Sequence, residues 1–381
     1  MLLNRQKAHS LMREANLDAL VLAYTENVMY FSDFLRVRSN HLKSRLSYVV
    51  FFADEALEPA FLVPHQDYLE SKAGTWITDV RRTSEHRIPG AADIHHDRPG
   101  LVASVISERG LTGGRIGFEE ESLPFAIHQQ LATSLPGFEL VPAHRLLQRL
   151  RAIKSEMELK LIREAMRLTE VAGAAILNAA RPGISEIELA QLAEKAALAE
   201  GAERMDFLIV AAQERGAVVH GAPSDYRLQE GDVVRFDIGA SRDGFTGDLA
   251  RTFVVGKEAD PQHELHYSAI RAAVEAGIAV IKPGVTADEV YQAQMTAGRA
   301  IDPELSREHA GHGLGLEVHE EPMICEGNDF VLESGMVVMI ENARYLPGTA
   351  GYQLEDLVLV TETGHEILTT LSRDLLLENA Q

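Results

Sequence analysis

The sequence predicts an α+β protein with two domains, a smaller α/β domain over residues 1–151 and a larger domain over residues 152–381. The first observation is length, because 381 residues exceed what one ordinary hydrophobic core accommodates. The second is that strand-like apolar runs alternate with helical stretches before the junction, which is typical of a mixed or parallel sheet covered by helices. The third is that helices beyond the junction are followed by strands that look antiparallel, which indicates an α+β arrangement.

In the smaller domain, apolar residues at three- and four-residue steps predict the helices, and short apolar runs predict the strands. The predicted helices are residues 5–16, 101–109 and 124–134. The predicted strands are residues 19–23, 48–53, 60–63 and 114–118.

The domain junction is predicted near Ala152, within a long helical register over residues 146–177. Ser155 and Glu158, three residues apart, are the signature of a capping box that restarts a helix here. Pro182-Gly183 ends this register. Later helices are predicted at residues 185–200, 266–281 and 287–300, and strands at residues 207–211, 233–238, 250–255, 337–340 and 356–361.

The composition is 46% hydrophobic, 24% charged and 6% aromatic, as in soluble globular proteins. We expect no membrane span, since no segment reaches the roughly 18 uninterrupted apolar residues that one needs. We expect no secretory signal either, since the first residues carry charges at helical spacing. Cys325 is the only cysteine, which excludes an internal disulfide and a thiolate zinc site and favours the cytoplasm. The net charge of −21 argues against a nucleic-acid surface.

The most informative stretch is EHAGHGLGLEVHEEP, residues 308–322, in which His312 lies between glycines. Upstream, Asp237 and Asp248 stand eleven residues apart, at the end of one predicted strand and the start of the next. The turn signal Asp243-Gly244 between them predicts a hairpin that carries both carboxylates on one face. Downstream, two further carboxylates, Glu341 at the end of MVVMI and Glu355 before LVLV, are expected on a second hairpin-like unit.

Four carboxylates in one pocket would repel one another unless cations lie between them. Oxygen ligands with one imidazole suit Mn, Fe, Co or Zn, and two such ions can share a water and polarise a carbonyl. Glu341 is the candidate to accept the proton of that water. His220 and His319 are then available for substrate contact, proton donation or stabilisation of a tetrahedral intermediate. His309 either supports this site or is simply exposed.

Each residue also has a purely structural interpretation. Asp248 could pair with Arg251, and Glu355 could be a charge at the edge of a sheet. The argument for a metal centre rests on five ligand types in a consistent order and context.

This order, Asp, Asp, HGLGLEVH, Glu and Glu-Asp, resembles the creatinase/prolidase/aminopeptidase P group of metallopeptidases, which have the pita-bread fold. GDVVRFDIGASRDGFTGDLARTFVVG, HGAPSD and ESGMVVMIE extend the resemblance, and LDALVLAYTENVMYFSDF resembles the small creatinase-type N-terminal domain. The likeness therefore spans nearly the whole chain. It implies a pita-bread domain over residues 152–381 and a homodimer in which the small domain can border the partner's active site.

The resemblance also implies roles for individual residues. The residues that match the five ligands of a dinuclear Mn, Co or Zn centre are Asp237, Asp248, His312, Glu341 and Glu355. His220 and His319 match the substrate-handling histidines, and Gln353 stands where the family has a further substrate contact. Apart from the resemblance, His309 is a further candidate for substrate binding. Creatinase itself lacks the metal ligands, so their presence here favours a metal-dependent hydrolase over a metal-free binding protein on the same fold.

The chain departs from the family pattern at two places. Asn342-Ala343 stands where the peptidases usually carry Pro-Gly, and Gln353 stands where they usually carry an arginine that helps to hold the substrate. Unless Arg344 substitutes for that arginine, Gln353→Arg is expected to improve the hydrolysis of Xaa-Pro dipeptides. The segment around Arg36 and Arg38 is closer to creatinase than to prolidases.

Two substrate classes therefore stay open. The first is a short peptide, cleaved as by an Xaa-Pro dipeptidase or an aminopeptidase P. The second is a small non-peptide amide or cyclic C–N compound.

Overall fold

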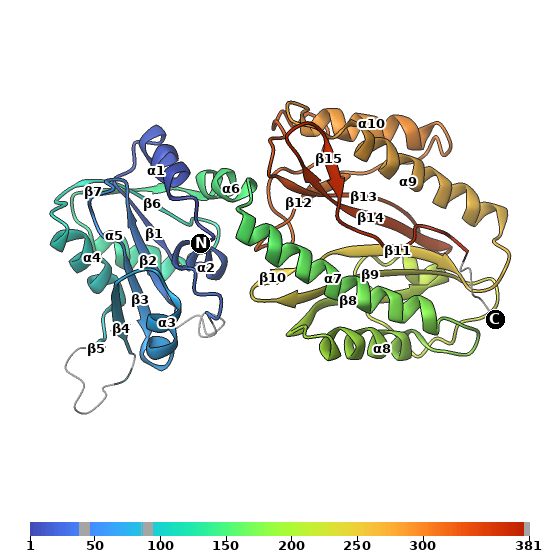
Figure 1. The fold of residues 1–381 in the computed structure, drawn as a ribbon, viewed down its shortest axis with the longest axis horizontal. Helices are drawn as coiled ribbons and strands as arrows, with labels where there is room; N and C mark the ends of the chain where they lie inside the picture. The colour runs from blue at the N-terminus through green and yellow to red at the C-terminus, as the bar shows by residue number, and fades with distance from the viewer. Residues whose placement is uncertain (38–45, 85, 87–93, 377–381) are drawn as a thin grey trace. The chain divides into compact units, whose positions relative to one another are not determined.

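The computed structural model describes residues 1–37, 46–84, 86 and 94–376, so Arg38 lies outside the described residues. The chain divides into two compact units, residues 1–151 and 152–381. The predicted α+β class is confirmed, since each unit combines helices with a sheet or sheets (Figure 1).

The first unit is built on a seven-stranded sheet with the order β5-β4-β3-β2-β1-β6-β7. β1 pairs antiparallel with β2 and parallel with β6, so the sheet is mixed. Its strands are β1 (Ala19–Leu22), β2 (Tyr48–Phe52), β3 (Ala60–Pro64), β4 (Asp79–Thr83), β5 (Ile94–His95), β6 (Gly114–Phe118) and β7 (Phe138–Pro142). Its helices are α1 (Arg5–Glu14), α2 (Thr25–Ser32), α3 (Tyr68–Gly74), α4 (Arg98–Glu108), α5 (Phe125–Ser134) and α6 (His144–Ala152).

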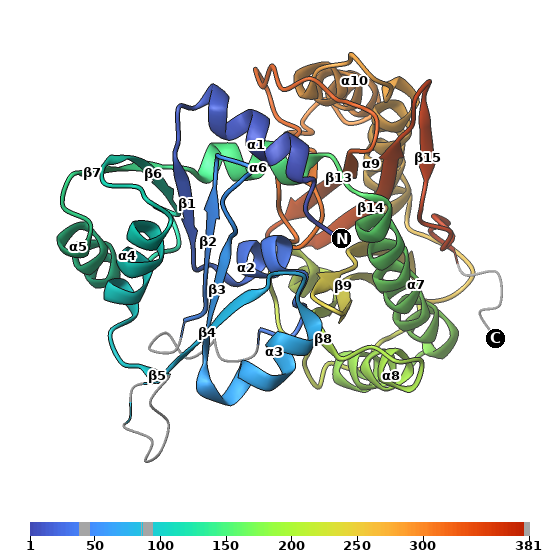
Figure 2. The same ribbon diagram turned by 60° about the vertical axis from the view of Figure 1, so that its left-hand side comes forward.

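Helices cover both faces of this sheet, because its strands are apolar on both sides. Val50 and Phe52 pack with the buried residues of α4 and α5 on one face, and Figure 2 shows these two helices on the same side of the strands. On the other face, Phe51 stacks on His9 of α1 at 4.9 Å and contacts Phe31 of α2 edge-on at 5.2 Å between ring centroids. Helices α2 and α3 were not predicted, since the apolar run in α2 has no clear helical period.

The second unit contains two antiparallel sheets. One has the order β10-β9-β11 with β8 also paired to β9, and the other has the order β12-β13-β14-β15. Their strands are β8 (Arg204–Ala212), β9 (Val233–Arg242), β10 (Phe245–Thr246), β11 (Leu249–Val254), β12 (Gly311–Gly313), β13 (Val337–Leu346), β14 (Ala350–Val360) and β15 (His365–Ile367). The helices are α7 (Glu156–Ala179), α8 (Glu186–Ala199), α9 (Pro261–Val280) and α10 (Ala287–Arg299).

Within this unit, α7 and α8 contact the first sheet, and α9 packs on β13 and β14 of the second, as Figure 1 shows. The sheets adjoin through β11 and β14. There, Thr252 Oγ1 donates to the Gln353 carbonyl at 3.0 Å and accepts from the Gln353 N–H at 2.9 Å. This junction brings the two predicted hairpins side by side.

The predicted capping box at the start of α7 is confirmed. Ser155 Oγ accepts the N–H of Glu158 at 3.3 Å, and the Glu158 carboxylate accepts the N–H of Ser155 at 2.8 Å. Just before it, Lys154 donates to Glu320 at 3.1 Å, and the two side chains are 0% and 1% exposed. A fully buried ion pair therefore ties the start of this unit to the segment that carries His319.

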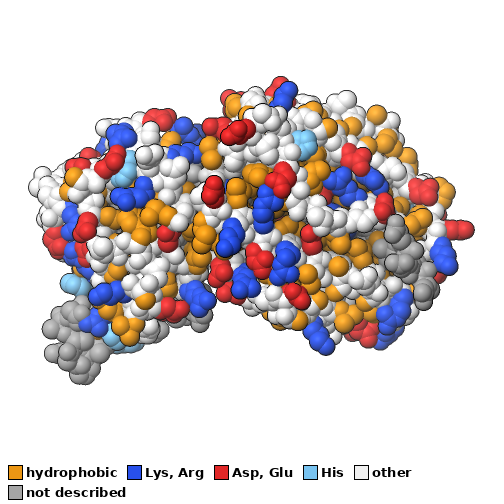
Figure 3. Space-filling model, viewed as in Figure 1, with side chains coloured by type: hydrophobic (Ala, Val, Ile, Leu, Met, Phe, Trp, Pro, Cys, Tyr) orange, Lys and Arg blue, Asp and Glu red, His pale blue; other side chains and the backbone are white. Residues whose placement is uncertain are grey.

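On the face seen in Figure 3, acidic and basic side chains are interspersed. Among the described residues, no helix has the length and apolar character that crossing a membrane requires.

Candidate metal centre

One cavity of about 680 Å³ in the second unit brings together every site residue predicted from the sequence. Its lining includes His220, Asp237, Asp248, His309, His312, His319, Glu341, Gln353 and Glu355. These residues span 136 positions of the chain (220 to 355), so the fold, and not local sequence, assembles them.

Asp237 and Asp248 share a face because of the strand register. Asp243-Gly244 forms a two-residue turn with φ values of 51° and 83°, which is the turn predicted from the sequence and one that favours tight hairpins. With this turn, Asp237 lies opposite Ala250. Asp248 lies two residues before Ala250 and therefore on the same face. In a hairpin with a two-residue loop, two residues on opposite strands share a face only when their spacing in sequence is odd, as it is for these two aspartates.

Glu341 and Glu355 are direct cross-strand partners on β13 and β14. The sequence placed them, and Asp237, near strand ends, and this was wrong, because β9, β13 and β14 all continue past them. Like charges directly opposite each other destabilise a sheet, and both glutamates are buried. Glu355 Oε2 has no hydrogen-bond partner among the described residues. A buried carboxylate oxygen without a donor fits a site that takes a cation.

His312 is held as a neutral imidazole with one nitrogen free. Its Nδ1 lies 3.1 Å from the Gly313 carbonyl, to which it can donate. Its Nε2 lies 3.5 Å from Asp248 Oδ2 and 3.9 Å from Glu341 Oε1. Burial lowers the pKa of His312 to about 4, and the neutral ring with its second nitrogen fixed by a carbonyl is the usual ligating form.

The flanking glycine Gly311 is required by geometry. Its φ is +146°, and a Cβ there would lie 2.2 Å from the Met339 carbonyl oxygen. A side chain at this position would therefore push β12 away from β13, and His312 with it.

Three of the carboxylates lie close enough to bind one ion. One oxygen each of Asp237, Asp248 and Glu355 lies within 4.8 Å of the other two. Burial raises the pKa of Asp237 to about 6. Burial, and next the neighbouring carboxylates, raise the pKa of Asp248 and the pKa of Glu355 well above the ordinary values. Both burial and the repulsion between neighbouring carboxylates disfavour the charged forms, and a divalent cation would offset both, so the donor set fits oxygen-preferring divalent metals.

Glu341 differs from these three. Burial would raise its pKa, but the close contact with His309 and the charge of Arg307 outweigh burial and lower the pKa to about 2. His309 Nδ1 lies 3.0 Å from Glu341 Oε1, and Arg307 Nη2 lies 3.1 Å from Glu341 Oε2. His309 therefore contacts this carboxylate and is not merely exposed.

The other two histidines lie at the rim. The His319 ring packs against His312, with 4.1 Å between centroids, and lies 6.3 Å from His309. His220 is exposed and lines the same cavity. Both have the access to solvent that contact with a substrate requires.

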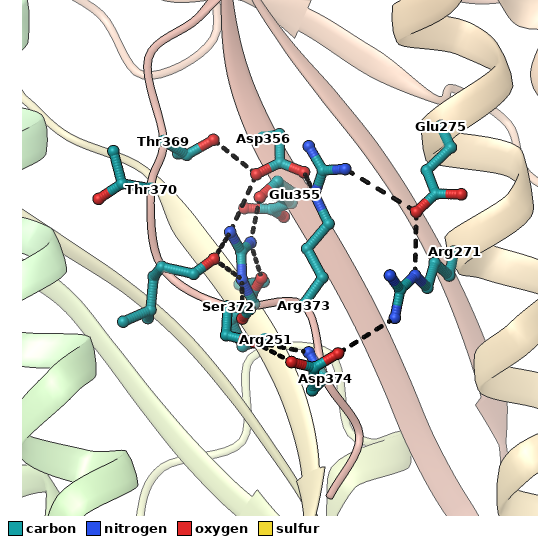
Figure 4. Close-up of polar contacts among 12 residues, drawn as sticks. Arg251, Arg271, Glu275, Glu355, Asp356, Thr369, Thr370, Ser372, Arg373 and Asp374 are labelled. Atoms are coloured by element: carbon teal, nitrogen blue, oxygen red, sulfur yellow. Dashed lines mark hydrogen bonds and ion pairs between the residues drawn. The ribbon is translucent and has the colours of Figure 1, made fainter. Parts of the chain in front are cut away.

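The structural alternatives considered for Asp248 and Glu355 are not what the structure contains. The ion pair of Arg251 is with Asp356, to which it donates at 2.9 Å (Figure 4). Glu355 is buried opposite Glu341, so it is not an exposed charge at the edge of a sheet.

The same network of hydrogen bonds and ion pairs also holds the backbone of β14. The sequence did not predict this network. Arg251 donates to the Leu371 carbonyl at 2.9 Å and to the carbonyl of Glu355 itself, while Arg373 Nε lies 2.6 Å from Asp356 Oδ2. Figure 4 shows Arg251, Arg373 and Thr369 around Asp356. The C-terminal segment therefore holds the backbone that carries Glu355.

The two departures from the family pattern have different surroundings. Asn342 is buried and donates to Gln294 at 3.3 Å, whereas Gln353 lines the cavity. Arg344 pairs with Asp302 and Glu304, both at 3.1 Å. It does not line the cavity, so it does not substitute for an arginine at position 353.

A buried group of four carboxylates with one imidazole, set between two adjoining sheets, fits a metal-dependent hydrolase. The chain belongs to metallopeptidase family M24, whose model matches residues 160–362, and residues 4–153 match the creatinase/prolidase N-terminal domain. The resemblance recognised from the sequence is confirmed, and with it the assignment to metal-dependent peptide hydrolysis.

Individual relatives agree with this assignment. Uncharacterized peptidase YqhT of Bacillus subtilis is 33% identical over 308 residues, 79% of this chain and 86% of that protein. The Xaa-Pro dipeptidase of Pyrococcus horikoshii is 34% identical over 259 residues, 68% of this chain and 74% of that protein. The crystal structure of dipeptidase PepE from Mycobacterium ulcerans superposes with a TM-score of 0.82 at 30% identity, covering 97% of this chain and 96% of that one.

Proposed function

We propose that this protein is a dipeptidase of the Xaa-Pro type that uses two divalent metal ions, Mn, Co or Zn, per subunit. The observation that carries the proposal is the convergence of five ligand-type side chains in one cavity. We assign as metal ligands Asp237, Asp248, His312, Glu341 and Glu355. The Xaa-Pro dipeptidases and dipeptidases among the relatives support a short peptide as the substrate.

Ions bound at this site supply a Lewis acid and an activated water. Glu341, which contacts Arg307 and His309, would be the carboxylate placed to accept a proton from that water. His220 and His319, at the rim, can hydrogen-bond the oxyanion or donate a proton to the leaving nitrogen. His309 orients Glu341 and borders the substrate.

We further propose that the protein is a cytoplasmic homodimer. The single cysteine supports the compartment, and the resemblance to dimeric peptidases supports the assembly. Light scattering during gel filtration tests the assembly, since a mass near 41.9 kDa would mean a monomer.

The decisive experiment combines metal analysis with a substrate panel. Chelation should abolish turnover of Ala-Pro, and added Mn²⁺ or Co²⁺ should restore it. Asp248→Asn should lose metal and activity together, because an amide is a poorer ligand and leaves neighbouring carboxylates uncompensated. Full activity in a metal-free preparation would refute the metal centre.

The same panel decides the substrate class. It should include Ala-Ala, a tripeptide with proline in second position, and a small non-peptide amide. Preference for the tripeptide would point to an aminopeptidase. Preference for the non-peptide amide would refute the dipeptidase proposal.

A further inference from the structure

Arg235 is a buried guanidinium beside the proposed metal ligands. It lies on β9 two residues before Asp237, so both side chains point to the same face of the strand, and its side chain is 0% exposed. Its Nη1 lies 3.6 Å from Asp237 Oδ2. An arginine without access to water is tolerated only when its N–H groups are bonded and its charge is balanced.

The first set of partners of Arg235 is a loop. Nε donates to the Gly216 carbonyl at 3.2 Å, and Nη2 donates to the carbonyls of Val218 and Val219 at 3.0 and 2.7 Å. This loop leads directly into His220. Arg235 therefore fixes the backbone from which a proposed substrate-handling histidine projects.

The second partner of Arg235 is Gln353 on β14. Arg235 Nη1 donates to Gln353 Oε1 at 2.6 Å, and the hydroxyl of Tyr345 donates to the same oxygen at 3.2 Å. Gln353 Nε2 donates to Asp237 Oδ2 at 3.1 Å and to Glu355 Oε1. The orientation of the amide is determined by its partners, because a guanidinium can only donate and an ionised carboxylate can only accept.

Gln353 thus connects a buried positive charge to two carboxylates from different strands. The hydrogen bond from the guanidinium to the amide oxygen polarises the amide, and this strengthens the hydrogen bonds that the amide nitrogen donates. The nitrogen in turn holds Asp237 of β9 and Glu355 of β14 in a fixed relative orientation. Second partners of this kind set the direction of metal ligands and strongly affect metal affinity.

We propose, resting on the metal centre assigned above, that Arg235 is a positioning residue that acts through Gln353. The pair aligns Asp237 and Glu355 for metal binding, and Nε and Nη2 of the same guanidinium fix the loop that ends at His220. The guanidinium that lies beside Asp237 therefore comes from β9 and not from position 353.

This arrangement changes the expectation for Gln353→Arg. Gln353 is only 4% exposed and each end of its amide already has partners. An arginine at 353 would place a second guanidinium against Arg235 and would remove the contact between Asp237 and Glu355. Gln353→Arg alone should therefore impair the enzyme instead of improving it.

The first test is Gln353→Met, which keeps the side-chain volume and Arg235 but removes the amide. The Mn²⁺ affinity of the metal-depleted protein, measured by titration calorimetry, should fall by about 10–100-fold, while its circular dichroism stays unchanged. Arg344→Gln, an arginine outside the cavity, is the control and should keep the wild-type affinity. An unchanged Mn²⁺ affinity in Gln353→Met would overturn the proposal.

The second test separates the loop from the ligands. In Arg235→Gln, amide hydrogen exchange over residues 216–220 should accelerate at least tenfold because three carbonyls lose their donors, whereas Gln353→Met should leave this segment protected. Equal exchange in wild type and Arg235→Gln would refute the loop contact. If Arg235→Gln does not fold, exchange in Gln353→Met still decides, since acceleration there would mean that the loop depends on the amide and not on the guanidinium.

The third test exchanges the two side chains. Arg235→Gln/Gln353→Arg keeps one guanidinium and one amide, so it should bind Mn²⁺ at least tenfold more tightly than Gln353→Arg alone. A double variant no better than that single variant would show that the pair does not act as a unit. Failure of the wild-type protein to bind any of Mn²⁺, Co²⁺ and Zn²⁺ would instead refute the proposed metal centre, which keeps the two conclusions separable.

Discussion

The buried ion pair between Lys154 and Glu320 allows a quantitative prediction about stability. Lys154→Met preserves most of the side-chain volume but leaves the Glu320 carboxylate, which is 1% exposed, without its counter-charge. Removing one partner of a buried pair costs about 3–5 kcal/mol, because the remaining charge loses its counter-charge at a site closed to water. For a unit of this size, such a loss lowers the melting temperature by roughly 6–20 °C.

The assay is differential scanning calorimetry of the metal-depleted protein, in which the transition of residues 152–381 should move. Arg163→Gln is the matched control, since Arg163 pairs with Glu366 at 2.7 Å but the two side chains are 44% and 47% exposed. Exposed pairs contribute about 0–1 kcal/mol, so this transition should barely shift. Lys154→Met/Glu320→Gln, which removes both charges, should recover at least half of the loss.

The outcome that refutes this reasoning is specific. If Lys154→Met shifts the transition no more than Arg163→Gln, the pair does not contribute as a desolvated ion pair. If the double variant is less stable than Lys154→Met, the carboxylate of Glu320 is stabilised by groups other than Lys154.

Further predictions concern pH and the rim of the cavity. Burial raises the pKa of Glu158 from 4.5 to about 7. The stability that the protonated Glu158 contributes is therefore present below pH 4.5 and is lost as pH rises through 7. Glu158→Gln should be more stable than wild type at pH 8, by up to about 3 kcal/mol, and should lose this advantage at pH 5. The exposed Glu156→Gln is its control in melting experiments at both pH values, and a pH-independent difference for Glu158→Gln would contradict the assignment. His220→Ala and His319→Ala should keep their metal while kcat/KM falls by roughly 100-fold or more; loss of metal from either variant would make that histidine a ligand. Because the amide of Gln353 is bonded to protein groups, Ala-Pro and its C-terminal amide should have similar kcat/KM, and a strong preference for the free dipeptide would mean that another cation holds the carboxylate.

Most elements of the fold could be predicted because their signals are local. The capping box at Ser155 and the turn at Asp243-Gly244 each depend on a few adjacent residues, and both are present. Helix α2 was missed because most of its residues are buried, so it lacks the polar face that makes a helix visible in sequence. The strands around Glu341 and Glu355 were predicted too short, since a charged residue looks like a strand end unless a site accommodates it.

The sequence by itself determined which side chains could bind metal, their order along the chain and the family to which the chain belongs. It also contained the register of the first hairpin, since a two-residue turn places Asp237 and Asp248 on one face. Tertiary structure alone decided that Arg251 pairs with Asp356 and that Arg235 meets Gln353, 118 residues away. The physical reason is that alternation along a strand sets the face of a side chain, whereas the neighbour across a junction between sheets depends on how the whole unit packs.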